Sequence, residues 1–163
     1  LKIDGHDIHQ NKTALKHVLG YVPQDIFLLD DSIAKNVAFG EVAGELDRKR
    51  VRWALNEALM EGFITKQKMG IDTQVGERGV RLSGGQKQRL GIARALYFGA
   101  NILVFDEATS ALDEATERAV MHNIAKLKNK YTLIVVAHRL STLKVCDRIY
   151  TLGEGGLVAT ELD

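Results

Sequence analysis

Two short apolar runs, Ile102–Phe105 and Thr132–Val136, constrain the fold of this 163-residue chain more than any other feature. Neither run alternates with polar residues, which is typical of strands buried on both faces of a sheet. Between them, apolar residues recur at helical spacing from Val120 to Leu127, behind Asp113, a residue type that caps helix N-termini. A strand, a helix and a second strand in this order predict a parallel crossover unit and therefore an α/β protein.

The other patterned segments predict a strand at 18–22, a short helix from Ser32 to Val37, a longer helix over 47–66, and a hairpin of strands 148–152 and 157–160. The single cysteine, Cys146, allows no internal disulfide. Twenty-two Lys and Arg against 21 Asp and Glu leave a formal charge of +1, so no global field attracts nucleic acid. An anionic ligand must therefore be held by local groups.

The segment Leu82–Gln86 has the pattern of a helix start that binds an anion. Ser83 and Gln86 have the spacing of a capping box. Gly84 and Gly85 each cost about 1 kcal/mol of helix stability relative to Ala, but they let a large ligand approach the backbone. The free N–H groups and the dipole of a helix start suit a phosphate. The alternative is an ordinary capped helix.

Polar residues also stand where the expected strands end. Asp106 and Glu107 directly follow the first apolar run, His138 comes just after the second, and Gln24 follows the strand expected at 18–22. Ligands of open α/β sheets bind at the carboxyl ends of the strands. There Asp106 suits Mg²⁺, Glu107 suits a general base, and His138 could donate to a terminal phosphate.

Each of these residues also has an ordinary alternative. The acidic pair could be a helix cap or a solvated turn, His138 a structural histidine, and Gln24 a turn residue. If Gln24 does serve a phosphate site, its amide could reach Mg²⁺ or the attacking water.

Taken in order, these segments resemble the motifs of the nucleotide-binding domain of ABC transporters. The similar segments are Gln24 for the Q-loop, Leu82–Gln86 for the signature, Ile102–Glu107 for the Walker B strand, Ser110–Asp113 for the D-loop and His138 for the switch histidine. The resemblance covers nearly the whole chain. It implies a P-loop NTPase-like parallel sheet core, with an inserted helical subdomain over about residues 30–98 and a catalytic core in the remainder.

The resemblance also implies the ligands and the roles of the site residues. Two such domains would sandwich ATP head to tail, with the signature of one facing the Walker A loop of the other. Glu107 would polarise water, His138 would stabilise the γ-phosphate, and Asp106 and Gln24 would hold Mg²⁺. The residues expected to bind the nucleotide are Ser83, Gly84, Gly85, Gln86, Gln24 and Asp113.

The segment Thr73–Gly79 is similar to the X-loop of exporters, in which a glutamate, here Glu77, approaches the transmembrane domain; it could otherwise be a linker. Three further segments also look exporter-like, closest to lipid or lipid-linked oligosaccharide flippases: 27–29, 36–40 and 91–96. The expected partners are a second nucleotide-binding domain and a transmembrane domain, contacted through the Gln24 and Glu77 loops. The expected location is the cytoplasmic face of a membrane.

One departure from the family pattern changes the expectation for the chain itself. No Gly-x-x-x-x-Gly-Lys-[Ser/Thr] loop occurs in the sequence, so the usual cradle for the β- and γ-phosphates is missing. In the family that loop precedes the segment resembling Leu1–Asp7, and the chain opens on Leu1 rather than Met. We therefore expect a domain whose N-terminal part is missing, with negligible ATPase activity on its own.

Two other functions fit the same motifs. The first is a soluble ABC-type ATPase acting on nucleic acid or the ribosome, which the near-neutral charge and the Glu77 segment disfavour. The second is a non-catalytic ABC interaction module, which the presence of Ser83, Glu107 and His138 disfavours. The leading expectation is an exporter ATPase that couples ATP hydrolysis to transport.

Overall fold

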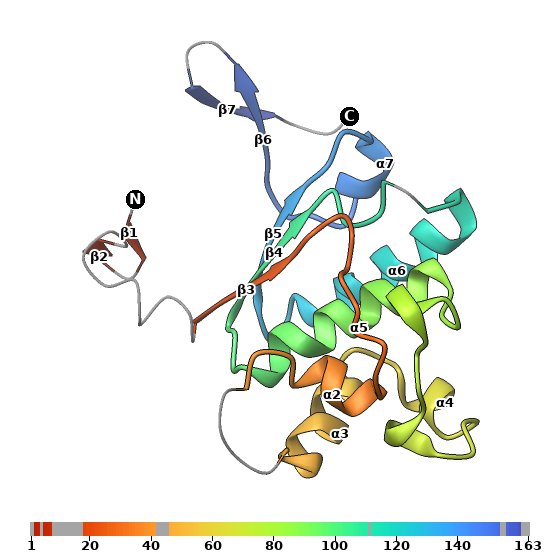
Figure 1. Cartoon of the computed structure of the whole chain (residues 1–163). Coiled ribbons are helices and arrows are strands. Elements are labelled where there is room, and N and C mark those ends of the chain that lie inside the picture. The colour runs from red at the N-terminus through yellow and green to blue at the C-terminus, as the bar shows by residue number, and fades with distance from the viewer. Residues whose placement is uncertain are drawn as a thin grey trace.

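A three-stranded parallel sheet forms the centre of the computed structural model, which describes residues 2–3, 5–7, 18–41, 46–110, 112–153 and 156–160. Its strands lie in the order β3 (Leu19–Val22), β4 (Ile102–Asp106) and β5 (Thr132–Val136), as Figure 1 shows. β4 and β5 are joined by α6 (Glu114–Leu127). The predicted parallel crossover unit is therefore confirmed.

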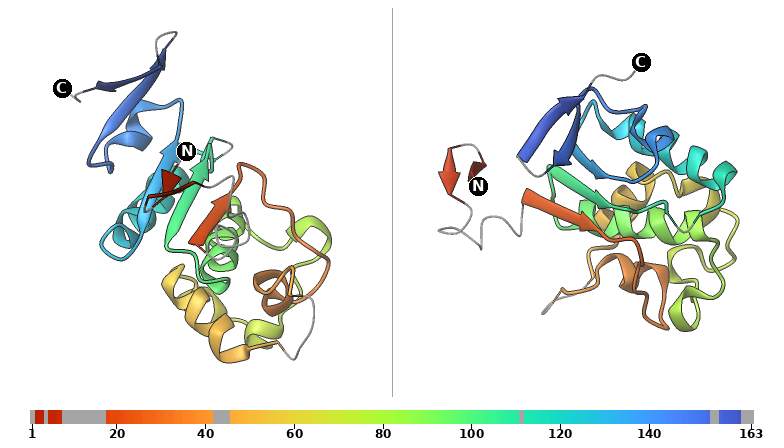
Figure 2. Two further views of the ribbon diagram at one scale, coloured as in Figure 1. Left: turned by 90° about the vertical axis from the view of Figure 1, so that its left-hand side faces the viewer. Right: turned by 90° about the horizontal axis from the view of Figure 1, so that it is seen from above.

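Helices form two layers on one side of this sheet. α5 (Gly84–Tyr97) packs against β3 and α6, whereas α2 (Ile33–Val37) and α3 (Arg48–Glu57) pack against the far side of α5 (Figures 1 and 2). The shorter elements are α4 (Glu61–Ile64), α7 (Leu140–Leu143), and the 3₁₀ turns η1 (Gly70–Asp72) and η2 (Glu77–Gly79). Among the described residues, no helix combines the length and apolar character that crossing a membrane requires.

Two antiparallel strand pairs lie outside the central sheet. β1 (Lys2–Ile3) pairs with β2 (His6–Asp7), and β6 (Ile149–Gly153) pairs with β7 (Gly156–Thr160). The second pair confirms the predicted hairpin. This hairpin projects from the top of the molecule in the view of Figure 1. The two residues between β6 and β7 lie outside the described part of the chain.

Small residues set the close contact between β3 and α5. A Cβ atom on Gly20 would lie 2.6 Å from the Cβ of Ala95 and 2.9 Å from the Cβ of Ala100. Only a residue without a side chain allows the strand to lie this near the helix. The interface continues into a core in which Leu96 and Leu103 are fully buried.

The helix predicted over 47–66 is wrong as one element, because the chain breaks it into α3 and α4. Leu59, between the two, has a φ of 56° in the left-handed region, which a helix cannot continue through. The N–H of Met60 donates to the carbonyl of Leu55 at 2.9 Å. This turn brings Met60 into the core, where it is fully buried. Burial of an apolar side chain explains why tertiary packing overrides the helical pattern.

The prediction that the strands are buried on both faces is also wrong, most clearly for β5. Ile134 and Val136 on this strand remain 48% and 47% exposed, and Tyr21 on β3 is exposed as well. The helices α5 and α6 cover the other face, which carries the buried residues Leu103 and Phe105 of β4. Within the described ranges the sheet therefore has one covered face and one open face.

Candidate functional site

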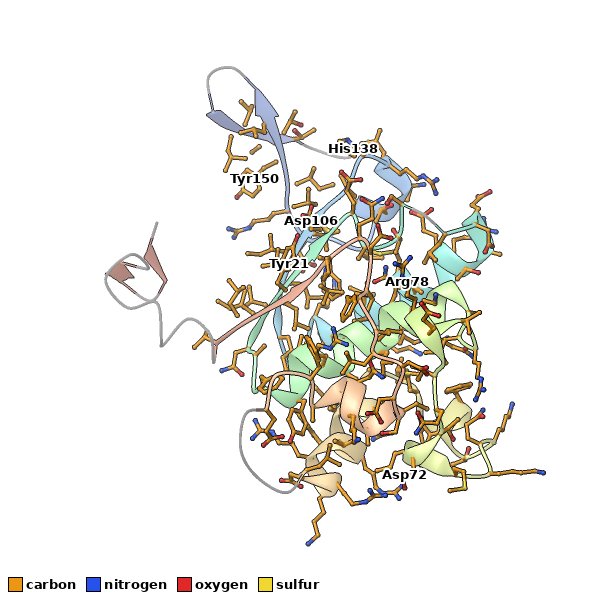
Figure 3. All side chains as sticks on the ribbon, viewed as in Figure 1. Tyr21, Asp72, Arg78, Asp106, His138 and Tyr150 are labelled. Atoms are coloured by element: carbon orange, nitrogen blue, oxygen red, sulfur yellow. The ribbon has the colours of Figure 1, made fainter. Side chains whose placement is uncertain are left out.

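The sequence-predicted polar residues gather at one edge of the sheet because its strands are parallel and end together. Asp106 is the last residue of β4 and Glu107 follows it, whereas His138 comes two residues after the end of β5. Figure 3 shows Asp106 and His138 on this edge, with Tyr21 of β3 beside Asp106. The structure thus unites the strand-end candidates that the sequence analysis singled out.

Glu107 and His138 are in direct contact. The Oε1 of Glu107 lies 2.8 Å from the Nε2 of His138, with the carboxylate half-buried and the imidazole exposed. At this distance one side chain can donate to the other, and both groups stand at the edge of the sheet where ligands of open α/β sheets bind.

The backbone of Glu107 is held in an unfavourable conformation. Its φ of 47° lies in the left-handed region, which costs a non-glycine residue about 1 to 3 kcal/mol. The Glu107 N–H donates to the carbonyl of Val136 at 2.9 Å. The Glu107 carbonyl accepts hydrogen bonds from both the N–H and the hydroxyl of Ser110, each at 2.9 Å. The turn around Ser110 therefore fixes the backbone from which the Glu107 side chain projects.

Asp106 has a partner that sequence reasoning missed. The hydroxyl of Tyr21 donates to Oδ2 of Asp106 at 2.6 Å. This hydrogen bond, together with the negative charge of Asp106, raises the pKa of Tyr21 above its ordinary value. The register of the parallel pair, which aligns Tyr21 with Val104, puts the tyrosine within reach of the end of β4. Because pairing register is a tertiary feature, the sequence alone gave no signal for this contact.

The segment that carries Gln24 is attached to α5. The Gln24 carbonyl accepts a hydrogen bond of 2.7 Å from Nε2 of Gln88, and the Phe27 carbonyl accepts one of 3.0 Å from Arg94. Gln88 is only 6% exposed, and its buried Oε1 has no hydrogen-bond partner among the described residues. The Gln24 side chain itself is exposed. A polar residue on the buried face of α5 was the signal that could have identified Gln88.

The capping box at the start of α5 is present as predicted. The Ser83 hydroxyl accepts from the N–H of Gln86 at 3.3 Å, and the side chain of Gln86 accepts from the N–H of Ser83 at 2.8 Å. The structure adds an internal reason for the two glycines. A Cβ atom on Gly84 would lie 2.6 Å from Leu112, and one on Gly85 would lie 2.9 Å from Thr116. The helix start therefore packs tightly against the start of α6.

Asp113 caps α6. Its carboxylate accepts a hydrogen bond of 3.0 Å from the N–H of Thr116. Hydrogen bonds from the Thr116 side chain and backbone lower the pKa of Asp113 below its ordinary value. The predicted residues thus form two groups: Gln24, Asp106, Glu107 and His138 at the strand edge, and Ser83 to Gln86 with Asp113 where α5 and α6 begin (Figure 1).

Glu77 lies in neither group. It is exposed at the first position of η2, and the next residue, Arg78, has a φ of 50°. The carbonyl of Arg78 accepts a hydrogen bond of 3.0 Å from the side chain of Lys87 on α5. Figure 3 shows Arg78 beside α5, away from His138 and Asp106. The Glu77 segment is therefore an exposed surface that is fixed to the same helix as the Gln24 segment.

A parallel sheet with a carboxylate and a histidine at its carboxyl edge, together with a capped helix start that lies apart from that edge, is the arrangement of a nucleotide-binding α/β domain. The family described as ABC transporter matches residues 1–110, which is more than half of the chain. The chain belongs to the ABC transporter family.

Individual relatives agree with this assignment. The chain is 42% identical over 157 residues to an ATP-dependent lipid A-core flippase of Vibrio cholerae, and 46% identical over 156 residues to an ATM1-type heavy metal exporter of Novosphingobium aromaticivorans. These alignments cover 96% and 95% of this chain but 27% and 25% of the relatives.

A solved structure described as a bacterial Atm1-family ABC exporter with ATP bound matches with a TM-score of 0.76 and 44% identity. It is covered over 28% of its length, and 96% of this chain is aligned. The chain therefore spans about a quarter of the length of the proteins it matches, and its fold is that of the matched part of the exporter structure.

Proposed function

We propose that this chain is part of the ATP-hydrolysing domain of an ABC exporter and supplies its catalytic side chains. The observation that carries the proposal is the contact between Glu107 and His138 at the carboxyl edge of the sheet. The relatives named above are exporters and flippases, which favours transport over a soluble ATPase acting on nucleic acid or a non-catalytic interaction module.

In this proposal Glu107 accepts a proton from the attacking water, or orients it, and His138 donates to an oxygen of the γ-phosphate. Phosphoryl transfer needs mainly positioning and charge stabilisation, so one acceptor and one donor on the same edge suit it. The strained backbone of Glu107 supports this role, since strain of this kind persists at sites where geometry matters.

The donor set at this edge fits Mg²⁺. Asp106 offers a carboxylate and Gln24 an amide oxygen, and Mg²⁺ prefers oxygen ligands of this kind with retained waters. When bound with ATP, the ion would neutralise charge on the phosphates. Asp106 would hold it, and the Gln24 segment would sense it through the attachment to α5.

The second group of residues suits a shared site between two copies. Ser83 to Gln86 would bind the γ-phosphate of ATP held by a second nucleotide-binding domain, and Asp113 in the adjacent loop would contribute to the same nucleotide site. Their separation from the strand edge of the same chain supports such a head-to-tail pairing. The transmembrane domain would contact the exposed Gln24 and Glu77 segments at the cytoplasmic face of the membrane, and residues of about 30–98 would form the helical subdomain that transmits motion.

Steady-state ATP hydrolysis by the complete gene product that contains this chain tests the proposal. Glu107→Gln keeps the shape of the side chain but removes the proton acceptor, so turnover should fall about 100-fold or more. Glu114→Gln is the matched control, because Glu114 is an exposed carboxylate paired with Arg118 at 2.7 Å. Glu114→Gln should retain wild-type turnover, and the 163-residue chain, which has no Walker A sequence, should show none.

Two results would contradict the proposal. The first is near-normal turnover by Glu107→Gln. The second is hydrolysis by the 163-residue chain that Glu107→Gln abolishes, which would mean that the site needs no Walker A loop.

A further inference from the structure

Within the described ranges, Glu117 of α6 is the charged residue that is buried, at 4% exposed. Burying an ionised carboxylate is costly unless it is paired and hydrogen-bonded. Glu117 lies three residues before Val120 and seven before Ile124, so the helical spacing places it on the buried, otherwise apolar face of α6. Its position therefore requires an explanation that the roles proposed above do not supply.

Three side chains satisfy this carboxylate. Oε1 accepts hydrogen bonds from Thr142 at 2.6 Å and from Thr109 at 3.3 Å, whereas Oε2 accepts one from Nη1 of Arg139 at 2.5 Å. Both threonines are buried as well. Although burial raises the pKa of Glu117, hydrogen bonds from Thr142 and Arg139 outweigh it and lower that pKa below its ordinary value.

The partners of Glu117 come from the segment that follows Glu107 and from the segment that runs from His138 into α7. Thr109 lies two residues after Glu107, and Arg139 directly follows His138. Arg139 also donates to the carbonyl of Ser110 at 3.5 Å, a long bond that spans the two segments. The carboxylate of Glu117 therefore connects the segment after Glu107 to the segment after His138 through hydrogen bonds.

The hydrogen bonds of Glu117 hold a turn, residues 107–110, whose backbone is strained at Glu107. Glu107 has its φ of 47° because Ser110 and Val136 hold it, and Thr109 and Ser110 lie in the same turn. A strained conformation persists only where the surroundings over-determine it. Loosening Thr109 and Arg139 would allow the turn to relax and would increase the separation of Glu107 and His138.

We infer that Glu117 is a positioning residue, whose buried carboxylate locks the turn 107–110 to the segment 138–142 so that Glu107 and His138 face the same reacting group. The inference rests on the proposed ATPase function for its kinetic readout. Glu117 touches neither nucleotide nor water in this role, because Thr109, Arg139 and Thr142 already use its oxygens.

The test compares Glu117→Gln with Glu114→Gln in the complete gene product. Glu117→Gln removes the charge that pairs with Arg139, whereas Glu114→Gln removes an exposed carboxylate from the same helix. We expect Glu117→Gln to lower kcat about tenfold or more, with the KM for ATP unchanged, because positioning affects the reacting state rather than binding. The Glu114→Gln control should leave both constants unchanged.

A second measurement follows the geometry rather than the activity. Hydrogen exchange measured by mass spectrometry on peptides covering residues 105–110 should become faster in Glu117→Gln and stay unchanged in Glu114→Gln. Thr142→Val provides a milder variant that keeps the shape and the Arg139 pair but removes the 2.6 Å bond. It should shift kcat and exchange in the same direction by smaller amounts, which keeps the test decisive if Glu117→Gln does not fold.

The inference would be overturned by wild-type kcat in both Glu117→Gln and Thr142→Val. A loss of kcat without faster exchange over residues 105–110 would overturn it equally. Glu107→Gln in the same assay separates this outcome from failure of the proposed function. If Glu107→Gln retains turnover, the ATPase assignment fails, and the exchange data alone decide whether Glu117 holds the turn.

Discussion

Gly20→Ala tests the close packing of β3 on α5. The strand β3 directly precedes the Gln24 segment. The added Cβ would lie 2.6 Å from the Cβ of Ala95, 2.9 Å from the Cβ of Ala100 and 3.0 Å from Leu103. The two alanine Cβ atoms are fixed to their backbones, so neither can rotate away. The strand and the helix must separate instead.

The size of the effect follows from these distances. Carbon atoms in contact prefer about 3.5–4.0 Å, so β3 and α5 must move apart by roughly 1 Å. Over-packing of this kind costs about 1 to 3 kcal/mol, and the rigid neighbours favour the upper end. Replacing glycine by alanine returns up to about 1 kcal/mol through the unfolded chain. The net loss should be about 2 kcal/mol, which lowers Tm by roughly 4–8 °C for a chain of this length.

Thermal unfolding of the 163-residue chain followed by circular dichroism measures this loss. Gly62→Ala is the matched control, because a Cβ on Gly62, within α4, meets nothing within 4 Å. That substitution should raise stability by up to about 1 kcal/mol, since alanine favours a helix. A Tm for Gly20→Ala equal to or above that of the wild type would refute the reasoning.

Two further predictions concern buried polar groups. The buried side chain of Asn36 accepts a hydrogen bond from the N–H of Leu29 at 2.9 Å and donates to the carbonyls of Leu29 and Ser32 at 3.1 and 3.0 Å. Asn36→Ala should therefore lower the free energy of unfolding, measured in a urea titration, by roughly 3 kcal/mol. An unchanged urea midpoint would contradict this. The lowered pKa of Glu117 means that its stabilising effect is present above its ordinary value of 4.5 and disappears as pH falls through the lower folded value. The difference in urea midpoint between wild type and Glu117→Gln should therefore shrink between neutral and acid pH, and a difference that grows there would contradict the assignment.

Much of the fold was predictable because local patterns determined it. The strands β3, β4 and β5, the α6 crossover and the β6–β7 hairpin follow from apolar runs and turn residues, and all are confirmed. Ser83 and Asp113 cap their helices as expected, since a cap depends on residues only three positions apart. The clustering of Asp106, Glu107 and His138 was also predictable, because parallel strands end at one edge.

The two glycines in the first turn of α5 show where sequence reasoning reached its limit. Gly84 and Gly85 suggested room for a ligand, and the structure shows in addition that Leu112 and Thr116 need the same space. Likewise, nothing in the local pattern indicates that Leu59 turns the chain and buries Met60, or that Ile134 and Val136 stay exposed. These outcomes depend on which elements pack together.

The sequence by itself determined most of the strands, the crossover helix, the caps and the list of strand-end residues, because each depends on neighbours within one turn or one strand. Only the tertiary structure decided how those residues are held. The partners of Glu117 are 8, 22 and 25 residues away in the chain, and Gln88 is 64 residues from Gln24. Contacts at such separations arise from packing of α5 and α6 against the sheet, and no local pattern specifies them.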